Sequence, residues 1–127
     1  MFWTIVGFGV LAVLAFDTVA SFVSVGFGFP YEDAAVGSVL IYATIGYLVF
    51  RRQGFFSAVG AALLVEVVDA TLGWYISWQI GPGALPVEQA TTAVIATTIV
   101  FVLIFAAVCA AIGSVIARVI HGPRTNA

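Results

Sequence analysis

The sequence predicts an all-α integral membrane protein, a bundle of four transmembrane helices that forms a single domain over residues 1–127. The first observation behind this prediction is composition: 63% of the residues are hydrophobic and 8% are charged, whereas a soluble domain carries about 25% charged residues. The second is the presence of four long apolar segments. The third is the placement of the arginines, which fits one fixed orientation in a bilayer. Lipid rather than water is therefore the expected solvent.

Each of the four apolar segments is long enough to cross a hydrocarbon core of about 30 Å, which takes about 20 helical residues. The predicted helices run over about residues 2–25, 34–50, 55–80 and 86–120. Glycine and proline in the first and third connections oppose helix continuation, and Gly81-Pro82-Gly83 is interpreted as a stop. The last segment is longer than a bilayer is thick, so it is expected to tilt or protrude.

The first segment is expected to be a retained helix rather than a cleavable signal peptide. A signal peptide has a basic start and an apolar stretch of about 7–15 residues. Residues 1–16 contain no charged side chain, and the apolar stretch continues well beyond them.

The arginines predict the orientation. Arg51 and Arg52 lie between the second and third segments, and Arg118 and Arg124 lie at the end of the fourth. In a four-span chain these two regions share one side of the membrane, and basic residues favour the cytoplasmic side. The sequence thus predicts a multi-pass cell-membrane protein with both termini in the cytoplasm.

Polar and aromatic residues at the helix ends agree with this placement. The acids at the outer helix starts are interpreted as groups that favour the N-terminal helix dipole: Glu32, Asp33 and Glu88. Six aromatic side chains are interpreted as anchors at the headgroup level: Tyr31, Trp74, Tyr75 and Trp78 outside, and Trp3 and Tyr47 inside.

A weak internal repeat relates the first segment to the third. A shift of 53 residues aligns seven identical residues in 27 positions, among them Phe2 with Phe55 and Thr18 with Thr71. A duplicated two-helix hairpin would give two parallel repeats, which often form a site between them. The alternative is that apolar helices of one composition resemble each other, and both interpretations stay open.

Three acids inside the predicted spans carry the strongest chemical signal: Asp17, Glu66 and Asp69. A charged side chain at the bilayer centre costs at least about 2.5–3.5 kcal/mol, so it is rare there without a role. Asp17 and Asp69 lie at similar predicted depths, and Glu66 lies three residues before Asp69 on the same helix face. His121 and all four arginines lie at or beyond the cytoplasmic ends of the predicted helices, so the chain offers these acids no counter-charge.

Small and polar residues share the helix faces of these acids, which indicates contact with other helices rather than lipid. Ser21 follows Asp17 by four residues, and Ser77 follows Asp69 along the third segment. The candidate ion- or substrate-binding residues are therefore Asp17, Glu66, Asp69, Ser21 and Ser77.

Four explanations of the acids are open at this point. They can be protonated and hydrogen-bonded to one another or to hydroxyl groups, they can line a water-filled path, they can bind an exchangeable cation, or they can pair with a basic residue of another protein. Three carboxylates can also bind a hard divalent ion, but no spacing here specifies a metal.

Several function classes are not expected. His121 is the only histidine and lies in a polar tail, so a histidine-based catalytic arrangement is not expected, and paired-histidine haem ligation is excluded. The single Cys109 permits no disulfide framework, and four arginines without any lysine form no nucleic-acid-binding surface. The sequence therefore predicts a non-enzymatic protein without a cofactor.

The leading hypothesis is a small transporter or channel-like protein that handles protons or cations through the intramembrane carboxylates. Since four helices scarcely enclose a pathway alone, this role implies a homo-oligomer or a membrane partner. The alternative is a non-catalytic scaffold or assembly subunit whose buried acids are structural or pair with a partner helix.

Overall fold

A computed structural model describes residues 1–123 of the chain, and within this range the only regular secondary structure is helical. Four helical spans are long and apolar enough to cross a membrane: Phe2–Phe27, Tyr31–Gln53, Phe55–Ile80 and Thr92–His121. The predicted class, an all-α bundle of four transmembrane helices, is confirmed. Arg124, one of the four arginines used to predict orientation, lies outside the described residues.

The first two spans are simple. Helix α1 covers Phe2–Phe27. A short 3-10 helix, η1 (Tyr31–Ala34), leads directly into α2 (Ala35–Gln53). These bounds lie close to the predicted ones, because glycine and proline follow α1 and glycine follows α2.

The third span is one helix with an irregular centre. It begins with α3 (Phe55–Val68), passes through the π-helical segment η2 (Asp69–Gly73) and ends with α4 (Trp74–Ile80). A π-helical turn adds a residue to the helical repeat, and such turns are frequent at functional sites. The hydropathy pattern predicted the length of this span but not the change of helix type within it.

The last helix begins later than predicted. Its expected start was near Pro86, but a single turn of 3-10 helix, η3 (Val87–Gln89), follows that proline, and α5 runs over Thr92–His121. Thr91 has an extended backbone, and its side chain accepts a hydrogen bond from the Val94 backbone N–H. Threonine thus caps α5, which leaves an irregular connection between α4 and α5.

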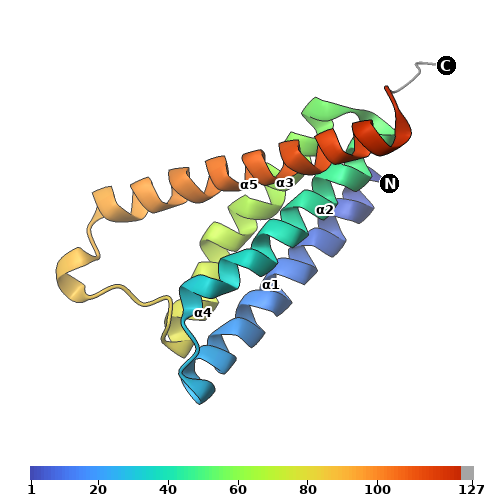
Figure 1. The fold of residues 1–127 in the computed structure, drawn as a ribbon. Helices are drawn as coiled ribbons and strands as arrows, with labels where there is room; N and C mark the ends of the chain where they lie inside the picture. Colours follow the sequence, from blue (N-terminus) through green and yellow to red (C-terminus); the bar gives the residue numbers. More distant parts are fainter. Residues whose placement is uncertain (124–127) are drawn as a thin grey trace.

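Figure 1 shows α1, α2 and the third span running side by side, with the start of α1 and the end of α5 at the same end of the bundle. Helix α5 packs on α2 and α3 near that end and diverges from the other helices toward its own beginning. The buried residues of α5 all lie from its middle onward: Ala106, Cys109, Ala110, Gly113, Ser114 and Ala117. Residues 92–105 of α5 contain no buried side chain.

The tightest contact in the molecule is the crossing of α2 and α5. A Cβ atom added to Gly113 would meet the backbone carbonyl of Ala43, and one added to Gly46 would meet the backbone of Ala110. Ser114 donates a hydrogen bond to the Ala110 carbonyl at 2.8 Å, as a polar side chain within a helix often does. Small residues let the two backbones approach, which is how helices associate in lipid.

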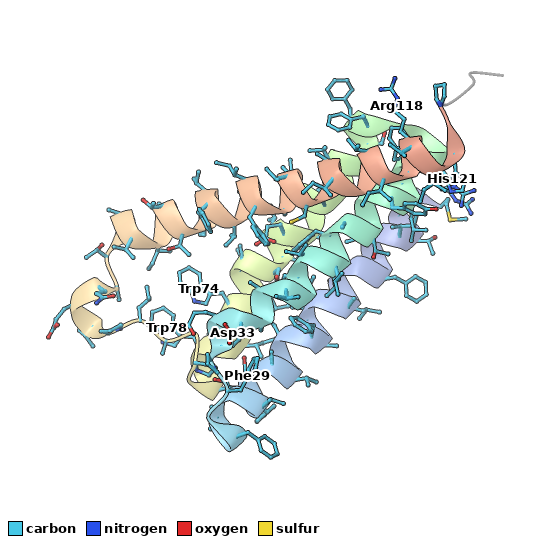
Figure 2. All side chains as sticks on the ribbon, viewed as in Figure 1. Phe29, Asp33, Trp74, Trp78, Arg118 and His121 are labelled. Carbon is cyan, nitrogen blue, oxygen red and sulfur yellow. The ribbon has the colours of Figure 1, made fainter. Side chains whose placement is uncertain are left out.

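The two ends of the bundle differ in charge. Figure 2 shows Arg118 and His121 at the end where α1 begins and α5 ends, and Asp33 and Trp78 at the opposite end. His121 Nε2 is hydrogen-bonded to the Tyr47 hydroxyl at 2.6 Å, and the Arg51 guanidinium lies 6.0 Å from the centre of the Tyr47 ring. The basic side chains of residues 1–123 therefore lie away from the intramembrane acids.

Candidate functional site

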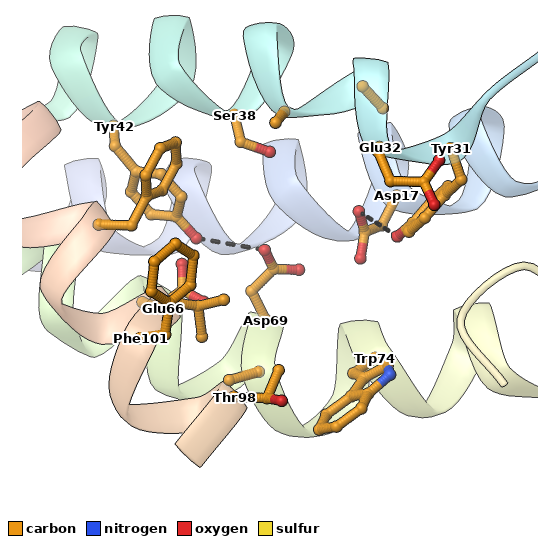
Figure 3. A pocket seen from close by; sticks show the side chains of 15 residues that line it. Asp17, Tyr31, Glu32, Ser38, Tyr42, Glu66, Asp69, Trp74, Thr98 and Phe101 are labelled. Atoms are coloured by element: carbon orange, nitrogen blue, oxygen red, sulfur yellow. Dashed lines mark hydrogen bonds between the residues drawn. The ribbon is translucent and has the colours of Figure 1, made fainter. Parts of the chain in front are cut away.

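A cavity of about 540 Å³ lies in the half of the bundle where α5 diverges, and all four spans contribute to its walls. Figure 3 shows this cavity from close by. Three of the predicted site residues, Asp17, Glu66 and Asp69, line it. The structure thus brings together two acids of the third span and one acid of α1, although Asp17 precedes the other two by 49 positions or more along the chain.

Asp17 reaches the cavity from the second half of α1. Its Oδ1 atom accepts a hydrogen bond from the Tyr31 hydroxyl at 3.1 Å. Tyr31 begins the short helix η1, so the connection between α1 and α2 folds back over the acid. This bond uses one oxygen of the carboxyl group and leaves the other directed toward the cavity (Figure 3).

Asp69 begins the π-helical segment and lies opposite Asp17. Its Oδ2 atom accepts a hydrogen bond from the Tyr42 hydroxyl of α2 at 3.2 Å, whereas its Oδ1 atom is buried without a hydrogen-bond partner. A Cβ atom added to Gly73 would collide with Asp69 Oδ1 and would lie 3.2 Å from Asp17 Oδ2. The two carboxyl groups therefore face each other across the space that Gly73 leaves open.

Glu66 is the least exposed of the three acids. Its side chain is only 4% exposed, and it lies one helical turn before Asp69. The neighbouring Tyr42 hydroxyl donates its proton to Asp69, and a hydroxyl group has only one proton to give. Glu66 and Asp69 therefore compete for the same hydroxyl group.

The cavity contains no compensating positive charge, since neither arginine nor histidine is among its lining residues within the described chain. The part of the chain that the structure describes also holds no group of three or more His, Cys, Asp or Glu side chains arranged to bind a metal ion. The three acids surround a common space without converging on one point. This arrangement can hold protons or a cation.

Aromatic side chains form much of the remaining wall: Tyr31, Tyr42, Trp74, Phe101 and Phe105. The Trp74 indole N–H donates a hydrogen bond to the Gly83 carbonyl at 2.9 Å, which fixes the ring against the connection after α4. Tyr31 and Trp74, which were interpreted from the sequence as interfacial anchors, both line the cavity.

The two predicted serines lie outside this group. Ser21 and Ser77 are fully buried, and neither hydroxyl has a hydrogen-bond partner in the structure. Neither serine lines the cavity. Ser77 packs against Gly83, and a Cβ atom added to Gly83 would collide with the Ser77 hydroxyl. The absence of a side chain at Gly83 therefore lets the chain turn back after α4.

Sequence reasoning missed Tyr42, the residue that joins α2 to the acids. Tyr42 is 1% exposed and lies near the middle of its span. Tyrosine normally lies at the membrane interface, where its hydroxyl meets water. A tyrosine in the middle of a span therefore indicates a polar partner inside the bundle, because a buried hydroxyl needs a hydrogen-bond partner.

No protein family, curated protein or solved structure shows a match to this chain. The function must accordingly be inferred from the chemistry of the cavity.

Proposed function

We propose that this protein is a small transporter or channel-like protein that moves protons or cations by means of Asp17, Glu66 and Asp69. The observation that supports the proposal is that these three acids line one cavity, within apolar spans, that has no basic residue in its wall. Carboxyl groups placed inside a membrane without a counter-charge are typical of ion and proton pathways.

The physical argument rests on the cost of leaving a carboxylate in lipid. An ionised carboxylate there needs a cation, a hydrogen-bond donor or water to offset lost solvation. Tyr31 and Tyr42 each supply one donor, to Asp17 and Asp69 respectively. The remaining oxygens, together with Glu66, are available to a proton or cation that enters and leaves.

The test is flux into liposomes that contain the purified protein. Proton and alkali-cation fluxes would be measured with internal dyes for wild type and for Asp17→Asn, Glu66→Gln and Asp69→Asn. We expect each substitution to lower the flux at least about tenfold, because amides neither carry a proton nor attract a cation.

The matched control is Asp33→Asn, which removes an exposed acid at the cavity end of the bundle and outside the cavity wall. We expect it to leave the flux unchanged. If the wild type moves no cation, or if all three cavity variants equal wild type, the proposal is wrong.

A second candidate function, a scaffold or assembly subunit, is favoured by the divergence of α5. Because residues 92–105 bury no side chain within the chain, a helix of another protein could fill this region and bring a Lys or Arg to the acids. This alternative predicts a co-purifying membrane partner that the three amide variants release. A stable isolated chain with cation flux would exclude it.

The transport proposal has two corollaries. The basic end of the bundle faces the cytoplasm of a cell-membrane protein, because basic residues favour that side, and the cavity faces outward. A homo-oligomer of parallel chains completes the pathway, since one bundle of four helices encloses little space. Cross-linking in native membranes and protease access to each terminus would test both statements.

A further inference from the structure

The cavity combines two kinds of wall that a pathway for protons alone does not need. Acidic groups come from α1, η1 and the third span, and aromatic rings come from η1, α2, α4 and α5. Figure 3 shows Asp17 and Asp69 directed into the space, with Trp74 and Phe101 among the residues around it. The volume of about 540 Å³ falls in the range of about 300–1,000 Å³ that small-molecule sites occupy.

An inorganic cation fits this cavity poorly. Hard cations such as calcium take about six to eight oxygen ligands at short range. Within residues 1–123 no group of three metal-ligating side chains is close enough to serve, and most of the lining residues are aromatic or aliphatic. A ligand that fills this space must cover apolar surface as well as meet a carboxylate.

Two buried acceptors show where the positive charge of such a ligand belongs. Asp69 Oδ1 is buried without a partner, and the Glu66 side chain is 4% exposed and lines the cavity. Aromatic faces nearby attract cations through the ring quadrupole, and the attraction grows when water is excluded. Trp74, which its indole hydrogen bond holds in place, is the best ring for this contact.

We infer that the cavity binds an amphipathic organic cation, a quaternary ammonium or phosphonium centre that carries apolar groups. The carboxylates of Asp17, Glu66 and Asp69 offset its charge, and Trp74, Phe101 and Phe105 cover its apolar groups. This inference rests on the proposed function, because it assigns a substrate class to the same acids.

The experiment is isothermal titration calorimetry of the full chain in detergent micelles, with tetraphenylphosphonium as the probe. Triphenylphosphine oxide, which is neutral and of similar shape, controls for partition into the micelle, and tetramethylammonium controls for charge without apolar bulk. We expect saturable binding of tetraphenylphosphonium alone.

Two pairs of variants locate the site. Trp74→Ala should weaken binding at least about tenfold, whereas Trp78→Ala, which removes the neighbouring indole outside the cavity wall, should leave it unchanged. Asp69→Asn should weaken binding by a similar factor and Asp33→Asn should not. Circular dichroism and size-exclusion profiles equal to wild type would show that each variant folds.

The outcomes separate this inference from the proposed function. Absence of saturable tetraphenylphosphonium binding, or equal effects of Trp74→Ala and Trp78→Ala, overturns the inference, and proton or alkali-cation flux that persists in that case leaves the proposed function standing. Saturable binding that depends on Trp74 and Asp69 supports the inference, and absence of any flux in liposomes would then contradict only the transport step.

Discussion

The two halves of the bundle use their residues in opposite ways. Toward the end of α5, glycine and alanine bring α2 and α5 into backbone contact at Gly46 and Gly113. In the other half, α5 diverges from α2, and the space between the helices is lined by four acids, Glu32 among them, and several aromatic rings. One half is closely packed and the other holds the cavity.

This difference shows how a small chain in lipid can hold a cavity open. Helix association in a membrane depends on close packing, because lipid is as apolar as the side chains. The α2–α5 crossing supplies that packing from the middle of α5 onward, where all buried residues of this helix lie. The first half is thereby free to stand apart and form a wall of the cavity.

The largest effect on the closely packed half of the bundle is expected from Gly113→Ala. The added methyl group would collide with the Ala43 carbonyl, and overpacking of this kind costs about 1–3 kcal/mol. We expect the free energy of unfolding, measured by titration with dodecyl sulfate, to fall by this amount. Gly60→Ala is the matched control, because its Cβ would meet no atom within 4 Å. Equal effects of the two substitutions would show that the crossing does not anchor the bundle.

A smaller effect is expected from Tyr42→Phe, at the boundary between the two halves. This change removes the hydrogen bond to Asp69, and we expect the free energy of unfolding to fall by about 0.5–1.5 kcal/mol. Tyr75→Phe is the control, since Tyr75 is 62% exposed. The same dodecyl sulfate titration measures both variants, and an unchanged Tyr42→Phe variant would mean that the hydroxyl adds nothing to stability.

The smallest effect is expected from Phe101→Ala, in the diverging half of α5. Phe101 is 66% exposed, so its removal should change the free energy of unfolding by less than about 0.5 kcal/mol. Val49→Ala, in the closely packed half and fully buried, should cost more than about 1 kcal/mol through lost packing. A large loss at Phe101 in thermal or dodecyl sulfate unfolding would reveal that the first half of α5 is packed after all.

Much of the fold could be predicted from the sequence. Twenty or more apolar residues in a row have few structures open to them in lipid, because every backbone N–H and C=O must be paired within the segment. The start of α5 was misplaced because proline at position 86 suits the first turn of a helix as well as the loop that the structure has. Hydropathy does not distinguish the two.

The candidate site was predicted in part. Asp17, Glu66 and Asp69 stood out because of the solvation cost of a carboxyl group in lipid, and all three line the cavity. Tyr42 and Phe101 did not stand out, since their contribution depends on which helix faces each acid. The predicted duplication and the predicted transport role stay predictions.

The sequence by itself determined that this protein consists of four membrane-spanning helices and that three of its acids lie inside them, because hydrophobicity and charge are properties of single residues and short segments. Only the tertiary structure decided that the three acids line one cavity. Around that cavity lie the π-helical turn at Asp69–Gly73, the tyrosines that donate hydrogen bonds to Asp17 and Asp69, and a helix α5 that packs at one end and diverges at the other. Those features depend on contacts between residues far apart in the chain, which no local pattern specifies.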